Sequence, residues 1–570
     1  MTPAPYDAFE APVSDRDRAV IYLAVLTALF LAALDQTIVS TALPRMVEDL
    51  RGIDRYAWVA TSYLLASTAL ALVYGKLADT YPRKLVTLGA VGLFLVGSML
   101  CGVAGELGDL PLLGDGMTQL VLFRGIQGAG GGGLFAMTFI VIADLFTPAE
   151  RGKYQGYVGA VFGIASVLGP VVGGLLTDHA GGIIPGVEGW RWVFYVNVPV
   201  GGLALWFIVR RMPSLEPHGE RRPPDLLGGL LLLGGLVPMI LSLQLDKRAF
   251  PWASPVTVGL FLAGALMLSA FVLRSRASAS PILDMGLFEN RVFRTANAAT
   301  FFFGASFMSV TIFLPLFLVN VLGVTATRAG AALIPFSLGI VFSATLSGQL
   351  VARIGYRRQI FGGALVFLAA VVLLAQMGSE VAYGRVTLYM ILAGLGVGPS
   401  MPLFTLAIQN AVDVRFVGQA TSASQFFRQT GATVGAALMG TVLATTLGIA
   451  FSSMELPAAL TGHPDESVEQ LVSTGGSGLP DRIVSAYAAL ANEASTAEES
   501  AALREEGRAS AERISREVEG AFARATGRIY ALTAVLLILA AGLALRIPEL
   551  PLRTTHDRVQ VRVPPALEGP

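Results

Sequence analysis

Cysteine, histidine and charged side chains are scarce in this chain of 570 residues. One cysteine and four histidines exclude a disulfide framework and argue against a structural zinc site. Charged residues make up 14% of the chain, against about 25% in a typical soluble protein. Acidic and basic residues number 40 each, and the absence of a basic excess argues against a nucleic-acid-binding protein.

Apolar residues are abundant instead, at 54% of the chain, with a mean hydropathy of +0.64. A membrane-spanning helix needs about 20 mostly apolar residues, and the sequence contains fourteen such stretches. We therefore predict an all-α integral membrane protein with fourteen transmembrane helices. The predicted spans are 19–43, 56–78, 85–104, 118–145, 152–177, 191–212, 226–245, 254–273, 294–320, 328–351, 359–378, 386–411, 418–447 and 527–547.

The distribution of Lys and Arg indicates the orientation, because cytoplasmic loops carry an excess of both. An even number of spans places both termini on one side, and the segments of that side hold 23 Lys and Arg. The opposite side holds 8 Lys and Arg, not counting those of its single long loop, to which the rule does not apply. Segment 1–18 is acidic at its start and lacks the apolar core of a signal peptide. Segments 1–18 and 548–570 are thus expected to be cytoplasmic tails.

A repeated motif divides the chain into two halves. The sequence GKLADTYPRK (Gly75–Lys84) and the sequence GQLVARIGYRR (Gly348–Arg358) each follow a second span and precede a third, if the halves begin at residues 19 and 294. The alternative is that both are ordinary basic loops of the cytoplasmic side. The predicted units are 19–212 with six helices, 213–293 with two extra helices, 294–447 with five helices, an outer loop 448–526, and the last helix 527–547.

Five segments, in order along the chain and including the first copy of this motif, carry a resemblance. They are LDQTIVSTALP (Leu34–Pro44), GKLADTYPRK, RGIQGAGGG (Arg124–Gly132), GIASVLGPVVGG (Gly163–Gly174) and WRWVFYVNVPVG (Trp190–Gly201). The arrangement resembles the major facilitator superfamily, in particular its fourteen-spanner branch of drug:H+ antiporters. The resemblance implies a multi-pass protein of a bacterial-type cytoplasmic (inner) membrane that is driven by a proton gradient and needs no cofactor or metal.

Asp35 is the one carboxylate deep in a predicted span, about 12 Å from Pro44. An acid at that depth costs roughly 2.5–3.5 kcal/mol on insertion scales and indicates a functional site. Arg124 lies at a matching depth in another span, so Asp35 and Gln127 are candidate partners for it. In the family, an acid in the D-x-T position and the arginine of R-x-x-Q-G are linked to proton coupling. The alternative is a purely structural ion pair.

The span 152–177 is rich in small residues at helical spacing. The resemblance assigns its motif to antiporters rather than to uptake proteins, which favours export. Small residues also allow close helix packing, and packing alone is the alternative role. The residues of this motif are Gly163, Gly169, Pro170, Gly173 and Gly174.

The turn after the second span is expected to be a cytoplasmic gate that connects the halves and releases during rocking. Its residues are Gly75, Asp79, Arg83 and Lys84, with Asp79 facing the two basic side chains. Pro82 departs from the family pattern, which puts the strength of this contact in question. The second copy of the motif has Ala352 in place of the aspartate.

Polar and aromatic residues at membrane depth are candidates for the substrate cavity. Arg428 either faces this cavity or pairs with a carboxylate at a neighbouring helix end. The aromatic run 301–307 offers an adaptable surface for bulky ligands, although such runs more often face lipid or the core. The predicted cavity residues are Gln36, Gln127, Phe303, Phe307, Gln425 and Arg428.

The outer loop 448–526 differs in composition, with many Glu, Ser, Ala and Arg residues. Thr496 and Glu499 fit a capping box, which predicts a helix from about 497 that continues into the last span. Asp481 is predicted to cap a shorter helix over 482–492, and 455–480 to be irregular. The loop could instead be a partly disordered segment, a docking surface for an outer protein partner, or a lid.

The leading hypothesis is a proton-coupled efflux antiporter that exports amphipathic or cationic small molecules by alternating access. Export of an endogenous lipid or metabolite is a second hypothesis, and a non-transporting membrane scaffold is a third. Charged residues deep in the spans argue against the scaffold, because it does not need them. An enzyme is not expected, since the sequence shows no nucleophile–base set and no phosphate-binding loop.

Overall fold

The fold is a bundle of long helices, seen here in a computed structural model. The described residues are 14–52, 55–109, 113–182, 187–216, 223, 225–245, 247, 249–324, 326–452, 454, 479–494 and 496–552. Within these residues fourteen helical segments are long and apolar enough to cross a membrane, and each overlaps one predicted span. The prediction of an all-α protein with fourteen transmembrane helices is confirmed.

The first half contains six of the spans, and the last of these combines two helices after a short 3-10 turn, η3 (Gly189–Arg191). Its helices are α1 (Asp15–Leu50), α2 (Tyr56–Thr80), α3 (Arg83–Gly102), α4 (Gly116–Leu145), α5 (Pro148–His179), α6 (Trp192–Tyr195) and α7 (Asn197–Arg211). The two extra spans are α8 (Leu226–Gln244) and α9 (Pro255–Ala277). The second half comprises α10 (Arg291–Asn320), α11 (Ala326–Ala331), α12 (Leu333–Ile354), α13 (Tyr356–Ala375), α14 (Tyr383–Val397), α15 (Ser400–Ala411), α16 (Val417–Ser452) and α19 (Ala497–Leu545).

Side-chain caps mark where several spans begin. Asp115, Asp225 and Asn290 each accept a hydrogen bond from a backbone N–H in the first turn of α4, α8 and α10. At α5, Thr147 and Glu150 form a capping box, and Pro148 occupies the first helical position. These residues satisfy N–H groups that have no partner within the helix, so they place the helix starts at the polar edges of the apolar stretches.

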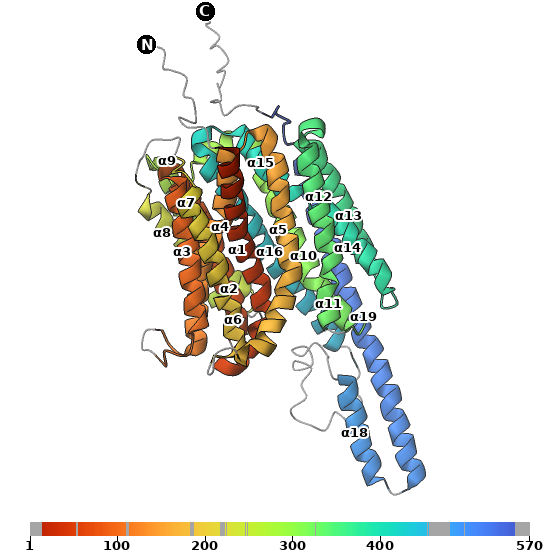
Figure 1. Ribbon diagram of the computed structural model, residues 1–570. Helices are drawn as coiled ribbons and strands as arrows, with labels where there is room; N and C mark the ends of the chain where they lie inside the picture. The colour runs from red at the N-terminus through yellow and green to blue at the C-terminus, as the bar shows by residue number, and fades with distance from the viewer. Residues whose placement is uncertain are drawn as a thin grey trace, which may run out of the picture.

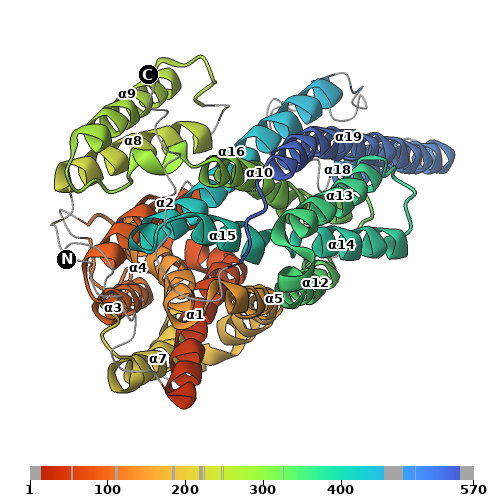
Figure 2. The same ribbon diagram turned by 90° about the horizontal axis from the view of Figure 1, so that it is seen from above.

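Figures 1 and 2 show the two halves side by side, with α8 and α9 outside them next to α2 and α16. Helix α1 begins and α19 ends at the same face of the bundle, called the terminal face below; the opposite one is the far face (Figure 1). The halves meet where α5 packs on α12 and where α2 packs on α16. These two pairs of helices form the main boundary between the halves, and α15 and α4 add smaller contacts to it.

Glycines bring the halves together near the terminal face. A Cβ atom on Gly348 of α12 would overlap the carbonyl of Gly152 at the start of α5, and one on Gly75 of α2 would overlap Ser422 of α16. Farther along the same helices, Gly173 of α5 and Gly431 of α16 contact helices of their own half instead. The closest contact between the halves therefore lies on the side of the terminal face.

Helix α19 is 49 residues long, about 70 Å at 1.5 Å per residue, and extends well beyond the bundle at the far face (Figure 1). Thr496 caps its first turn by accepting a hydrogen bond from the Glu499 N–H, which confirms the predicted helix from about 497 into the last span. Helix α18 (Leu479–Glu493) packs along this extension. Asp481 lies inside the first turn of α18, so its prediction as the cap was wrong. Residues 455–478 of the predicted irregular segment lie outside the described residues.

Candidate functional site: a buried carboxylate network and a contact between the halves

Asp35 of α1 is completely buried and accepts hydrogen bonds from three side chains. Arg124 Nη1 lies 2.6 Å from its Oδ2 atom, and Gln127 Nε2 lies 2.8 Å from its Oδ1 atom. Asn197 Nδ2 lies 3.2 Å from the same Oδ1 atom. The predicted contact of Arg124 with Asp35 and Gln127 is present, and the carboxylate joins α1, α4 and α7.

Helix geometry explains why these side chains converge. Arg124 and Gln127 are three residues apart on α4, so they lie on one face, and Arg124 Nη1 also donates to Gln127 Oε1 at 2.7 Å. The Arg124 guanidinium lies over the Tyr63 ring of α2, 4.4 Å from its centre. Such a cation–π contact adds to the stabilisation of a buried cation. The Asp35 carboxylate is thus the anion that compensates the buried Arg124.

A second charged cluster connects the halves near the terminal face. Asp79, at the end of α2, accepts hydrogen bonds from the backbone N–H groups of Gly418 and Gln419 at 2.9 and 2.8 Å. These groups belong to the N-terminus of α16, where the helix dipole favours an anion. Arg83 completes the cluster, with Nη2 3.8 Å from Asp79 and Nε 2.8 Å from Asp144 of α4. A carboxylate of one half and a helix terminus of the other thus form a contact between the halves at this motif.

Lys84 does not belong to this cluster, although the sequence predicted that it faces Asp79. Its Nζ atom donates to the Val209 carbonyl at 2.8 Å, on α7. Residues 83 and 84 are adjacent on the first turn of α3, so their side chains point about 100° apart. Only Arg83 can turn toward Asp79, and the prediction for Lys84 was wrong.

A chain of amides also crosses the boundary between the halves. Gln155 of α5 donates to Gln409 of α15 at 2.9 Å, and Gln409 donates to Thr421 of α16 at 2.9 Å. On the other side, Thr68 of α2 donates to Gln429 of α16 at 2.8 Å. These polar bridges satisfy groups that would otherwise be buried without partners.

The small residues of α5 face two different helices. Cβ atoms on Gly169 and Gly173 would overlap Thr37 and Thr41 of α1, and a Cβ atom on Gly163 would overlap Val341 of α12. Helix α5 therefore packs closely on the helix that carries Asp35 and also on the opposite half. A Cβ atom on Gly174 would meet nothing within 4 Å, so Gly174 is not part of either contact. Pro170 is exposed.

The residues predicted to line the cavity differ in their burial and in their contacts. Phe303 was expected at the cavity, but it is 4% exposed and packs between Phe367 and Phe404 in the core of the second half, so that prediction was wrong. Gln127, also expected there, belongs to the buried Asp35 network. Phe307 is partly exposed and stacks on Phe336, with ring centres 5.9 Å apart.

The remaining predicted cavity residues stay partly or fully inside the bundle. Gln36 is partly exposed next to Asp35. Arg428 is partly exposed and donates to Gln425, which is buried. Within the described part of the chain, no carboxylate lies within ion-pair distance of Arg428, so the alternative of pairing with an acid at a helix end is not supported.

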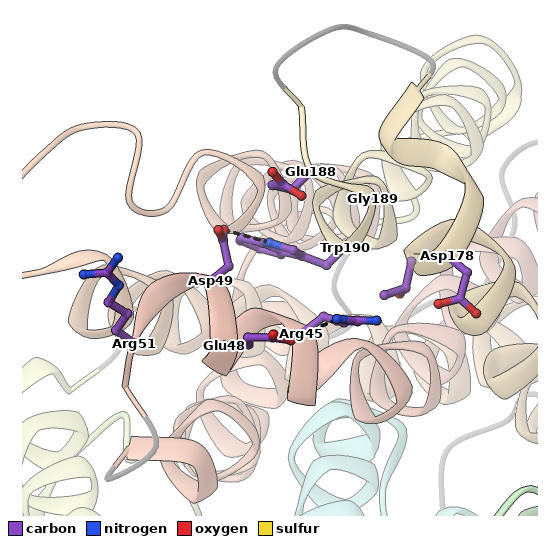
Figure 3. A pocket seen from close by; sticks show the side chains of 9 residues that line it. Arg45, Glu48, Asp49, Arg51, Asp178, Glu188, Gly189 and Trp190 are labelled. Atoms are coloured by element: carbon purple, nitrogen blue, oxygen red, sulfur yellow. Dashed lines mark hydrogen bonds and ion pairs between the residues drawn. The ribbon is translucent and has the colours of Figure 1, made fainter.

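The far face carries an open hollow of about 490 Å³ at the ends of α1 and α5 (Figure 3). Its side chains are mostly paired with one another. Trp190 Nε1 donates to Asp49 at 3.0 Å, and Arg45 lies 3.0 Å from Glu48. These contacts join the outer ends of α1 and of the segment that precedes α6, and the hollow lies away from Asp35.

Comparison with known proteins identifies the family. The sequence profile of the Major Facilitator Superfamily matches residues 25–436. The chain belongs to the Major Facilitator Superfamily. Multidrug resistance protein 3 of Bacillus subtilis (strain 168) is 36% identical over 470 residues, covering 81% of this chain and 88% of that protein. Multidrug transporter protein MdtP of the same organism is 36% identical over 426 residues, covering 75% of each chain.

A solved structure supports the same fold. The major facilitator proton:xylose symporter XylE, bound to 6-bromo-6-deoxy-D-glucose, superposes with a TM-score of 0.54 at 13% identity, covering 94% of this chain and 96% of that chain. The chain is thus a multi-pass membrane transporter of this superfamily and not an enzyme.

Sequence reasoning missed three residues of the facilitator's two charged clusters. Asn197 and Asp144 are buried polar groups in apolar spans, and that property alone marks them as candidates. Tyr63 could not be found in this way, because a tyrosine in a span is common and its contact with Arg124 depends on how α2 packs on α4.

Proposed function

We propose that this transporter is a proton-coupled efflux antiporter, which exports amphipathic small molecules in exchange for protons. The observation that supports the proposal is the completely buried Asp35 carboxylate, bonded to Arg124, Gln127 and Asn197. A carboxylate at this depth is costly, and in membrane transporters such groups serve proton pathways. The names of the multidrug relatives from Bacillus subtilis favour export.

Packing suggests how a proton at Asp35 would affect the boundary between the halves. Loss of the charge on Asp35 would release Arg124 and loosen α1 against α4. Helix α1 contacts α5 closely at Gly169 and Gly173, and α5 in turn contacts α12 of the other half. A shift of α1 would therefore change the packing of the helix that closes the boundary, as alternating access requires.

The terminal face would be the cytoplasmic one. The excess of Lys and Arg in its loops supports this orientation. In this arrangement the Asp79 contact with α16 closes the cytoplasmic side, and it would have to open before a substrate could reach the space between the halves. The substrate would then be released to the outside when the contact of Asp79 with α16 forms again.

The test uses proteoliposomes with an imposed pH gradient and a dye that reports internal pH. Amphipathic dyes and drugs of positive, neutral and negative charge are added to the wild type, to Asp35→Asn, and to Asp178→Asn as a control. Asp178 is an exposed carboxylate at the far face and is not part of the Asp35 network. We expect substrate-dependent proton movement in the wild type and the control, and none in Asp35→Asn. Equal movement in all three proteins, or none with any compound, would refute the proposal.

A further inference from the structure

Arg428 is a cation inside the bundle, and none of the described acidic side chains lies within ion-pair distance of it. It lies 11 residues from the start of α16, about 16 Å along the helix. Its side chain donates a hydrogen bond to the Gln425 oxygen. Among the described residues, the other arginines at membrane depth are better compensated. Arg124 pairs with Asp35, and Arg83 pairs with Asp144.

This difference matters because an uncompensated cation in a membrane protein is costly. Estimates for an arginine at the centre of a span start at about 2.5 kcal/mol. A neutral amide such as Gln425 offsets only part of that cost. A cation with this cost and only a neutral partner indicates a site for a ligand that carries the missing charge.

The position of Arg428 places it at the boundary between the halves. Thr421, Gln425 and Arg428 are four and three residues apart, so they lie along one face of α16. Thr421 belongs to the amide bridge that reaches α5, and Gln429, next to Arg428, bonds to Thr68 of α2. Arg428 therefore lies about 10 Å from the amide bridge toward the far face. Arg428 is partly exposed, so a ligand at the boundary between the halves can reach it.

Close packing fixes the backbone that carries this side chain. A Cβ atom on Gly304 of α10 would overlap the Arg428 carbonyl, and one on Gly431 would overlap the carbonyl of Phe301. Phe307, one turn along α10 from Gly304, is partly exposed and stacks on Phe336 of α12. A cation carried on a fixed backbone, with a partly exposed aromatic residue on the neighbouring helix α10, suits a ligand with one charged end and one apolar end.

The buried carboxylates, unlike Arg428, are bonded to groups of the protein and do not face a ligand. Both oxygens of Asp35 are occupied by donors of the protein itself, and the side chain is completely buried. Asp79 and Asp144 are bonded to α16 and to Arg83 near the terminal face. A cationic substrate would therefore meet Arg428 without meeting a free carboxylate from these three residues.

We propose that Arg428, together with Gln425, binds the anionic group of the substrate, so that the preferred substrates are amphipathic organic acids. The inference builds on the proposed transport function and replaces the cationic substrates expected from the sequence. An arginine fits this role because its planar group can donate two parallel hydrogen bonds to a carboxylate, sulfonate or phosphate. Gln425, as an amide, can donate a further hydrogen bond through its NH2 group.

Direct binding tests this inference without any proton gradient. The full-length protein is placed in lipid nanodiscs and titrated with three matched fluorescent probes: 11-(dansylamino)undecanoic acid, its primary amide and the corresponding undecylamine. Empty nanodiscs correct for partitioning into lipid. Hydrogen bonds to a charged group contribute roughly 1.5–3 kcal/mol, so we expect the acid to bind the wild type at least about tenfold more tightly than the amide.

Three variants locate the effect. Arg428→Gln is expected to lose the preference for the acid, and Arg428→Lys to keep part of it, because a lysine retains the charge but not the planar geometry. Arg528→Gln is the matched control, since Arg528 is also an arginine of a long helix but bonds to Thr446 away from this site. It should bind all three probes as the wild type does. Thermal unfolding of each variant reports whether it is folded.

Several outcomes would overturn the inference. These are equal binding of acid and amide by the wild type, preference for the amine, binding of none of the probes, and full retention of the acid preference in folded Arg428→Gln. The wild-type comparison decides even if that variant does not fold. Failure of proton movement in the proteoliposome experiment would instead contradict the proton coupling, so the two proposals fail separately.

Discussion

The two buried aspartate clusters use the same residue types in different ways. Asp35 accepts all its hydrogen bonds from side chains, and every partner belongs to the same half. Asp79 accepts its shortest ones from backbone N–H groups of the opposite half. A change at Asp35 can therefore alter the packing of one half without directly breaking the contact between the halves. A change at Asp79 acts on that contact itself.

This comparison predicts that a substitution of Arg124 lowers the free energy of unfolding more than the other substitutions below. Arg124→Gln leaves the Asp35 carboxylate buried without its positive partner, which typically costs about 3–5 kcal/mol. The double variant Asp35→Asn/Arg124→Gln removes both charges and should recover a large part of that loss while remaining inactive in proton exchange. Thermal unfolding of the single and double variants measures this. A double variant that is less stable than Arg124→Gln would contradict the interpretation of a compensated pair.

The second prediction concerns the contact between the halves. Asp79→Asn keeps at most one neutral hydrogen bond to α16, because its amide nitrogen cannot accept a bond from the second backbone N–H. The terminal face should therefore open more often. A cysteine at position 422, introduced as Ser422→Cys in a Cys101→Ser background, reports this opening through its rate of reaction with a water-soluble maleimide. We expect labelling about tenfold faster in Asp79→Asn.

Lys84→Gln is the control for this experiment, because Lys84 lies next to Arg83 in the chain but bonds to Val209 on α7. It should leave the labelling rate unchanged. Equal acceleration by both substitutions would mean that the general charge of the turn, rather than the specific bond of Asp79, holds the halves together.

The third and smallest effect is expected along α5, which connects the helix that carries Asp35 to the opposite half. Gly169→Ala would force a methyl group into Thr37 of α1, at a cost of about 1–3 kcal/mol, and should slow transport. Gly174→Ala, five residues along the same helix, meets nothing within 4 Å and should change stability by less than about 0.5 kcal/mol. Unfolding temperatures and transport rates of the two variants decide whether this packing links Asp35 to the boundary between the halves.

Much of the fold and one central contact could be predicted from the sequence. The spans follow from apolar length, because the bilayer sets that length. The pairing of Arg124 with Asp35 follows from equal depth and opposite charge, since few other partners exist in an apolar interior. The long helix α19 follows from a local cap at Thr496. Each of these properties depends on the chain near the residue or on the membrane, not on the detailed packing of helices.

The predictions that failed, and the contacts that were missed, depend instead on how helices pack against one another. Phe303 was placed at the cavity because aromatic side chains suit both cores and ligands, and only the position of Phe367 and Phe404 decides between the two. The partners of Asp79 are backbone groups, which have no signal in the sequence. The lack of an acid near Arg428 likewise depends on how the surrounding helices pack.

The sequence by itself thus determined the number and limits of the spans, the two halves and the costly charges within them, because hydrophobicity and helix propensity act locally. Tertiary structure decided which charges are compensated and which are left for a ligand. It did so because ion pairs and cavities depend on distances of a few ångströms between helices that are far apart in the chain.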